Sequence, residues 1–177
     1  MKSHKYTRSV KRLVFIIIMG ALGNVLGMLS ISIPAPPPLR LELHFSQLTP
    51  LLVGISIGPI DGAITGALSL IVATLKIKNP LIPLGNAILA GIAGLASRKF
   101  RPVLAAIVGE IAETPFIWFS MILWVHLVCG VPLEVLIPII IVVNIKAFIE
   151  VLISSIVIEI LLRSKEIRFL LSSIRSG

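Results

Sequence analysis

Long apolar segments separated by short polar or proline-containing stretches dominate this chain of 177 residues. A helix needs about 20 apolar residues to cross a hydrocarbon core of about 30 Å. Within these segments apolar residues occupy nearly every position, so no polar face is left for water. The pattern predicts an all-α integral membrane protein with six transmembrane helices, at approximately 13–33, 47–57, 61–75, 81–96, 103–128 and 134–162.

The number of spans depends on Gly58-Pro59, which interrupts the apolar stretch 47–75. With six spans, twelve basic residues fall on the side that holds both termini and three on the other side. With five spans the two sides hold seven and eight basic residues. Cytoplasmic loops carry an excess of Lys and Arg. We therefore expect residues 1–177 to form a single six-helix membrane domain with cytoplasmic N- and C-termini.

Composition supports a membrane protein and excludes several other classes. Hydrophobic residues make up 56% of the chain and charged residues 14%, with a mean hydropathy of +1.06. A soluble domain has about 25% charged residues. The net charge of +8 could indicate nucleic acid, but the basic residues flank apolar runs, which favours lipid headgroups as their partners. The single Cys129 excludes an intramolecular disulfide and a multi-cysteine metal site.

Small residues recur at a spacing that lets helices approach closely in lipid. Gly58, Gly62 and Gly66 follow one another at intervals of four, and the first span carries Gly20, Ala21, Gly23 and Gly27. Tight packing within the chain explains most of this spacing. A docking face for another membrane subunit is the alternative, and it applies best to the first span.

Four ionisable residues lie inside predicted spans: Glu110, Glu113, Lys146 and Glu150. Such residues are costly in a membrane and are functional candidates by default. A hairpin of the last two spans that turns near Gly130 brings all four to one layer of the bilayer. They form a buried ion-pair network, contact a ligand, or relay protons; Glu113 and Lys146 are the ligand contacts we expect.

Other polar and aromatic side chains extend the candidate site. Trp124 lies eleven residues after Glu113, on nearly the same helix face, from which it could stack on an aromatic ligand. The full set of predicted substrate-binding residues is Glu113, Lys146, Trp124, Asn144, Asn86, Trp118, Arg40 and His126. Each has a structural alternative: interface anchors for the tryptophans, helix bridging for the amides, a pair with Glu134 for His126, and a solvated loop for Arg40.

Residues 41–54, followed by Gly-Pro at 58–59 and a small-residue helix, carry a resemblance to a known family. They resemble the substrate-binding S components of energy-coupling factor (ECF) vitamin transporters, in particular the riboflavin-type group. That group has an aromatic–Ser–acid–hydrophobic–Pro start to its second helix. Gln47 stands where the family often has an acid, and glycines replace the Ala-x-x-x-Ala face of the first helix.

The resemblance implies a multi-pass protein of the prokaryotic cell membrane that captures a vitamin-like molecule from outside. It implies as partners a transmembrane coupling subunit and two ATPase subunits, and no cofactor. The chain has no phosphate-binding loop, no Gly-x-Ser-x-Gly and no His-Glu-x-x-His, so no catalytic residue or metal site is predicted. A self-sufficient proton-coupled carrier is the alternative, followed by a membrane-embedded enzyme.

The residues give conflicting indications about the ligand. The acids and tryptophans favour a cationic aromatic molecule such as thiamine, and the second helix resembles proteins that bind riboflavin. Lys146 suits an anionic vitamin such as pantothenate or folate. The sequence leaves these alternatives open.

Overall fold

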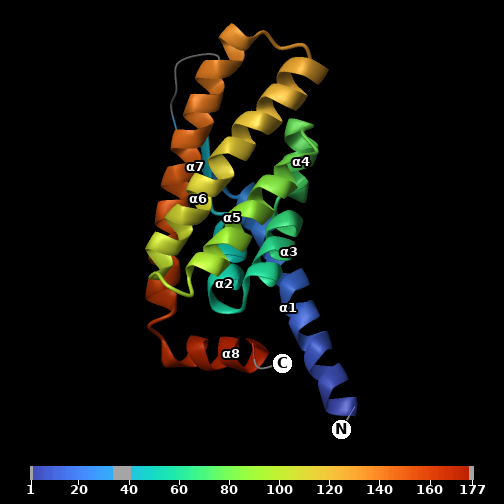
Figure 1. Cartoon of the computed structure of the whole chain (residues 1–177), viewed down its shortest axis with the longest axis vertical. Coiled ribbons are helices and arrows are strands. Elements are labelled where there is room, and N and C mark those ends of the chain that lie inside the picture. The colour runs from blue at the N-terminus through green and yellow to red at the C-terminus, as the bar shows by residue number, and fades with distance from the viewer. Residues whose placement is uncertain (1, 34–40, 176–177) are drawn as a thin grey trace.

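A computed structural model describes residues 2–33 and 41–175, which form a bundle of helices with one short hairpin of two strands (Figure 1). The elements, in chain order, are α1 (Lys2–Met28), β1 (Ser30–Ile33), β2 (Leu41–His44), α2 (Leu48–Ser56), α3 (Pro59–Ser69), α4 (Ile71–Ile77), α5 (Ile82–Ala96), α6 (Pro102–Ser120), the π-helix η1 (Met121–Val128), α7 (Leu133–Leu161) and α8 (Lys165–Arg175).

Three helical segments are long and apolar enough to cross a membrane: Val10–Met28, Pro102–Val128 and Leu133–Leu161. Helices α3 and α4 make a fourth if the pair, bent by 41°, is counted as one span. These lengths and compositions agree with the predicted class, a helical multi-pass membrane protein. Helices α2 and α5 are shorter, and six spans remain a prediction.

The first helix ends earlier than the predicted 13–33. It stops at Met28, and residues 30–33 form a strand that pairs antiparallel with β2, from Ser30 opposite His44 to Ile33 opposite Leu41. Ser and Ile alternate at 30–33, which is the period of a strand, and the neighbouring strand 41–44 takes up its backbone hydrogen bonds. The connection between the first two predicted spans, 34–46, is therefore partly strand, and its residues 34–40 lie outside the described part.

The break at Gly58-Pro59 separates two helices, because α2 ends at Ser56 and α3 begins at Pro59, where proline fits the first helical position. The predicted helix 61–75 is itself divided near Leu70. The side chain of Asn24, on α1, forms hydrogen bonds with the backbone on both sides of this second break. Its Nδ2 donates to Leu68 O (2.6 Å), and its Oδ1 accepts from Val72 N–H (2.9 Å). The bend is thus stabilised by a side chain from another helix.

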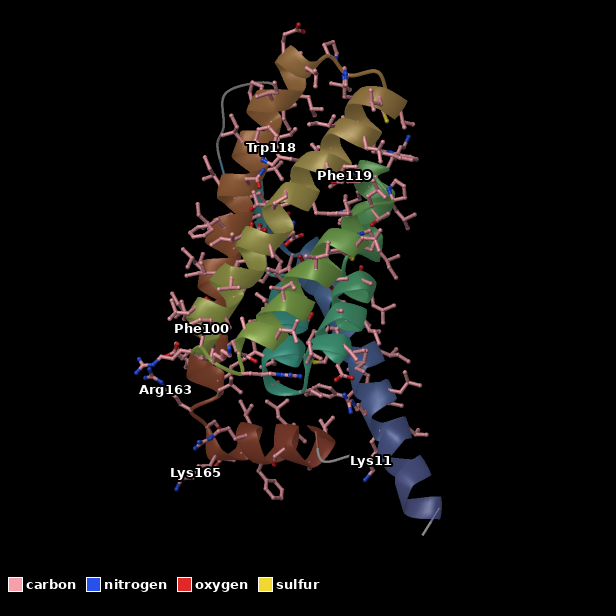
Figure 2. All side chains as sticks on the ribbon, viewed as in Figure 1. Lys11, Phe100, Trp118, Phe119, Arg163 and Lys165 are labelled. Carbon is pink, nitrogen blue, oxygen red and sulfur yellow. The ribbon has the colours of Figure 1, made fainter. Side chains whose placement is uncertain are left out.

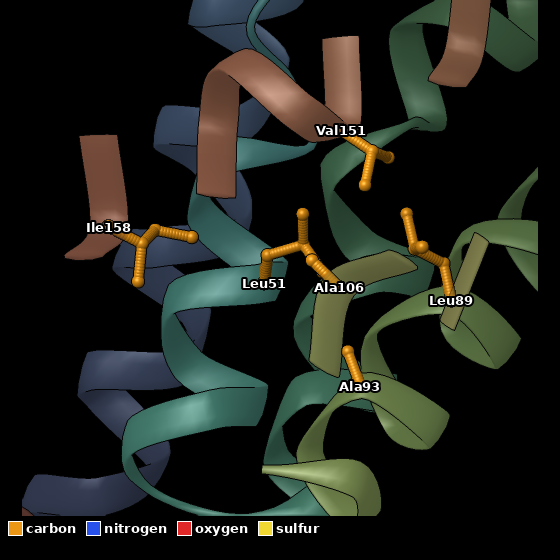
Figure 3. Packing of buried hydrophobic residues seen from close by; sticks show 6 residues of the cluster. All are labelled: Leu51, Leu89, Ala93, Ala106, Val151 and Ile158. Atoms are coloured by element: carbon orange, nitrogen blue, oxygen red, sulfur yellow. The ribbon is translucent and has the colours of Figure 1, made fainter. Parts of the chain in front are cut away.

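Helices α2, α3 and α5 pack backbone against backbone, at Gly54, Gly62 and Gly94. A Cβ added to Gly62 would overlap the backbone of Gly54, and one added to Gly94 would lie 2.6 Å from Gly54 O. We call these three positions the glycine crossing. Around it lies an apolar core, shown in Figure 3, that joins α2, α5, α6 and α7 through Leu51, Leu89, Ala93, Ala106, Val151 and Ile158.

The C-terminal helix α8 lies across the lower end of the bundle (Figure 1). Leu171 is buried there with Met19, Val53 and Ile57. Ser164 precedes the helix, and its Oγ accepts from Ile167 N–H (3.4 Å) and donates to Glu166 Oε2 (2.6 Å). Our sequence interpretation predicted no helix after 162, although the apolar residues of this segment recur at helical spacing.

Candidate functional site

Two adjacent cavities of about 310 Å³ each lie among α4, α7 and the end of β2. The first, which we call the carboxylate cavity, also contacts α5 and α6, and its polar lining residues are His44, Gln47, Asn79, Glu113, Ser120, Lys146 and Glu150. The second, the lysine cavity, also contacts α1, and its polar lining residues are Asn24, His44, Ser69, Lys76 and Lys146. His44 and Lys146 border both cavities.

His44, Lys146 and Glu150 form a cluster between the end of β2 and α7. Lys146 Nζ lies 3.5 Å from Glu150 Oε1 and 3.3 Å from His44 Nε2. The backbone N–H of His44 donates to Glu150 Oε1 (2.8 Å), and Ser46 Oγ lies 2.9 Å from His44 Nδ1. Glu150 is buried, so the cluster compensates its charge within the protein.

The predicted layer of ionisable residues is partly brought together. Glu110 is close enough to both Glu113 and Glu150 for electrostatic interaction. Glu113, Lys146 and Glu150 line the carboxylate cavity, whereas Glu110 is not one of its lining residues. The cavity therefore has two carboxylates in different situations. Glu150 is paired with Lys146, and Glu113 is in no described salt bridge.

Three buried polar atoms of the carboxylate cavity have no hydrogen-bond partner within residues 2–33 and 41–175: Gln47 Oε1, Asn79 Nδ2 and Glu113 Oε2. Their residues are 6%, 1% and 6% exposed. Leaving such an atom unsatisfied costs about 1–3 kcal/mol. Groups of this kind that converge on one cavity are what a polar ligand needs, because the ligand can satisfy them together.

Gly85 makes room for the carboxylate of Glu113. A Cβ added to Gly85 would lie 2.8 Å from Glu113 Oε1. Gly85 is in the first turn of α5 and Glu113 is on α6, so the packing of these two helices fixes the carboxylate against the cavity wall. The α5–α6 contact thus positions a cavity residue as well as part of the core.

The two predicted amides lie outside both cavity linings and have hydrogen-bond partners within the protein. Asn86 is fully buried, and its Nδ2 donates to Gly66 O (3.1 Å) and Ser69 Oγ (2.9 Å), so it bridges α5 and α3. Asn144 donates to Ile140 O (2.7 Å) in its own helix. Asn86 thus bridges two helices, as the structural alternative predicts, whereas Asn144 forms a hydrogen bond within its own helix.

The tryptophans and His126 also lie outside both linings. Trp124 Nε1 donates to Lys78 O (2.6 Å), at the connection between α4 and α5. The expected stacking above Glu113 assumed a regular α-helix, whereas residues 121–128 wind as a π-helix. His126 Nδ1 lies 2.8 Å from Val131 O across the turn that precedes α7. Trp118 is half-buried on α6, and Figure 2 labels it. Arg40 lies outside the described residues.

The small residues of α1 mostly pack within the chain. A Cβ added to Gly20 would lie 2.6 Å from Leu68 Cβ, and one added to Gly23 would lie 2.6 Å from Thr49 Oγ1. Gly27 borders the lysine cavity, and Ala21 is exposed. The close approach at Gly20 and Gly23 is therefore used by α3 and α2, which leaves Ala21 as the exposed member of the predicted docking face.

The polar residues of the carboxylate cavity that our predicted candidates did not include are His44, Gln47, Asn79 and Ser120. His44 is separated from Lys146 by about a hundred residues, and no periodicity relates them. Gln47 was noted only as a departure from a motif, and Asn79 lies between two predicted spans. Among the residues that the structure describes, no group of three or more His, Cys, Asp or Glu could hold a metal ion.

Comparisons with known proteins support the fold. No protein-family model matches the sequence, and no curated protein matches it. Among solved structures, the chain is similar to one described as "Structure and mechanism of the S component of a bacterial ECF transporter". The TM-score is 0.62 and the sequence identity 24%, over 92% of this chain and 98% of that chain. The chain therefore shares the fold of an ECF transporter S component.

Proposed function

We propose that this protein is the substrate-capture subunit of an ECF-type importer and that it binds a vitamin or related micronutrient in the carboxylate cavity. The observation that carries the proposal is that three residues lining that cavity each have a buried polar atom without a hydrogen-bond partner among the described residues. The similarity of the fold to a solved S component of a bacterial ECF transporter supports the same role. The protein itself catalyses no reaction in this proposal.

The proposed orientation gives the cavity access to the outside. Both described ends of the chain lie at the same end of the bundle, away from the α6–α7 turn (Figure 1). The carboxylate cavity is lined by the C-terminal part of α6 and the first half of α7, which lie towards that turn. With six spans and both termini in the cytoplasm of a prokaryotic cell, the cavity is placed in the outer half of the membrane.

Ligand binding by the isolated chain tests the proposal. The full chain is purified in mild detergent, and native mass spectrometry identifies any retained small molecule; a panel of vitamins, flavins included, is then titrated. We expect saturable binding of one compound, weakened at least about tenfold, or about 1.4 kcal/mol, by Glu113→Gln. The control Glu159→Gln, at a half-buried site near the end of α7, should bind normally.

Two results would count against this proposal. The first is a chain that folds but retains and binds no compound of the panel. The second is a Glu113→Gln protein that loses its folded state as well as its ligand, which would assign Glu113 to helix packing. Thermal unfolding in the same detergent separates loss of binding from loss of folding.

Transport assays test the partners. With a coupling subunit and two ATPases in the same liposomes, we expect uptake that depends on ATP hydrolysis. Uptake by the chain alone, abolished when the proton gradient is collapsed, would instead establish a proton-coupled carrier.

A further inference from the structure

We infer that the buried end of the ligand is a positively charged nitrogen group rich in N–H donors, and that Glu113 is the residue that selects it. This inference rests on the proposed function and names the chemical class of ligand for the same cavity. Among the ligands that the sequence left open, it favours a cationic aromatic molecule over riboflavin and over an anionic vitamin.

The charge of Lys146 is already used inside the protein. Its Nζ lies 3.5 Å from Glu150 Oε1 and 3.3 Å from His44 Nε2. An anionic ligand would have to compete with Glu150 for this single ammonium group. The lysine therefore completes a protein cluster and does not provide a spare positive charge for a carboxylate of the ligand.

Glu113 is in the opposite situation. It is 6% exposed and lines the cavity, and its Oε2 has no hydrogen-bond partner among the described residues. The described salt bridges pair Glu150, Asp61 and Glu159 with cations, and Glu113 is in none of them. A buried carboxylate without a partner is unfavourable, and a cation that enters the cavity removes this penalty.

The side-chain amides of Gln47 and Asn79 add a hydrogen-bonding pattern to the carboxylate of Glu113. Gln47 Oε1 is an acceptor and Asn79 Nδ2 is a donor, and both are buried without a partner in the described ranges. The orientation of Asn79 is fixed because its Oδ1 accepts from Leu81 N–H (3.0 Å). With Glu113, the wall offers two acceptors and one donor. An amidinium or aminopyrimidine edge, which carries N–H donors beside a ring or ring nitrogen, is complementary to it.

The rest of the cavity favours a flat apolar body next to that group. Phe116, Ile117, Met121, Ile139 and Val143 line it. The neighbouring lysine cavity has Lys76 and Lys146 and, among its described lining residues, no carboxylate. The positive end of the ligand is therefore placed in the carboxylate cavity and its other end towards the lysines.

Three probes of nearly equal shape and different charge test the inference: benzamidine, benzamide and benzoate. Their dissociation constants for the full chain in detergent are measured by saturation-transfer NMR, with empty micelles as the blank. We expect benzamidine to bind at least about tenfold more tightly than benzamide, and benzoate to bind most weakly, because a charge-assisted hydrogen bond is about twice as strong as a neutral one. Glu113→Gln should reduce the preference for benzamidine to less than about twofold.

Glu110→Gln is the matched control. It makes the same change on the same helix, three residues away, at a buried residue that is not in the cavity lining. It should keep the preference for benzamidine. A second variant, Gly85→Ala, keeps the carboxylate but displaces it, because the added Cβ would lie 2.8 Å from Glu113 Oε1. It should weaken benzamidine binding even if Glu113→Gln fails to fold.

Three outcomes overturn the inference: equal or tighter binding of benzamide or benzoate, an unchanged preference in Glu113→Gln, or no binding of any probe at millimolar concentration. The proposed function is judged separately, by the molecule retained in native mass spectrometry. A retained neutral or anionic vitamin would keep the proposed function and remove the inferred positive charge.

Discussion

The glycine crossing and the carboxylate cavity share helix α5, yet they are packed in opposite ways. At the crossing, Gly54 and Gly62 bring backbones so close that no Cβ fits between them. Around Glu113, about 310 Å³ is open and polar atoms have no partner among the described residues. Helix α5 belongs to both regions, with Gly94 in the crossing and Gly85 at the cavity.

This difference indicates a division of labour within the fold. Close helix contacts in lipid supply van der Waals packing, which is a main source of stability for a membrane protein. A cavity with unsatisfied polar groups reduces stability until a ligand fills it. The glycine crossing therefore stabilises the helix bundle, and the carboxylate cavity remains available for binding.

The largest expected effect is on the packed region. Gly62→Ala should lower the free energy of unfolding by about 2–3 kcal/mol, because the new Cβ meets the backbone of Gly54, which cannot move aside. The matched control is Gly91→Ala, where the nearest atom would be Ala63 Cβ at 3.4 Å, an ordinary contact. That change should be neutral or stabilise by up to about 1 kcal/mol, since alanine favours a helix. Reversible unfolding in mixed micelles measures both; equal stability of the two variants would contradict the comparison.

The next effect concerns the polar cluster of the open region. Lys146→Met should cost about 2 kcal/mol, because it leaves the buried Glu150 without its ammonium partner. The double variant Lys146→Met with Glu150→Gln should recover most of this loss, and a double-mutant cycle gives the coupling. If the second substitution brings no recovery, the lysine contributes by packing and not by charge.

A smaller effect is expected at the ion pair below the crossing. Arg12 Nε donates to Asp61 Oδ1 (2.8 Å), and Arg12 Nη2 pairs with Asp61 Oδ2. Asp61→Asn should cost about 1–2 kcal/mol, because Asp61 is buried in the first turn of α3. The control is Glu159→Gln, which removes a pair with the exposed Arg163 and should cost less than about 0.5 kcal/mol. Thermal unfolding compares the two, and equal costs would show that burial of Asp61 is irrelevant.

The smallest effect is local to α8. The Ser164 hydroxyl lowers the pKa of Glu166 by donating a hydrogen bond to its carboxylate. A lowered pKa means that this contribution to the helix start is present at neutral pH and is lost as the pH falls through the pKa of Glu166. Ser164→Ala should raise that pKa towards its ordinary value and weaken the start of α8, because the Ile167 N–H loses its hydroxyl acceptor. Carboxyl-carbon NMR titration measures the shift, and Ser172→Ala, in the exposed part of the same helix, should leave it unchanged.

Local sequence features were sufficient for much of the helical layout. Helix α5 was expected at 81–96 and is observed at 82–96, and α7 was expected at 134–162 and is observed at 133–161. Long apolar runs between proline or basic residues define these elements without help from the rest of the chain. The break at Gly58-Pro59 is local in the same sense, because glycine and proline act on their own backbone.

Features that depend on a distant partner were missed. The strand 30–33 needs its neighbour at 41–44, and the bend near Leu70 needs the side chain of Asn24. The expected place of Trp124 assumed a regular α-helix, whereas residues 121–128 wind as a π-helix and Trp124 Nε1 donates to Lys78 O. His44 enters the site because β2 ends beside α7, about a hundred residues further along the chain.

The sequence by itself determined that this is a helical membrane protein and that Glu113 and Lys146 are its candidates for ligand contact. Apolar length and the cost of charge in lipid are properties of segments and of single residues, so they can be read without coordinates. Only the tertiary structure decided which of the two charges is available. Lys146 is paired with Glu150 and His44, while Glu113 faces a cavity without a partner in the described chain. Charge compensation depends on distances between residues far apart in sequence, and only the folded chain sets those distances.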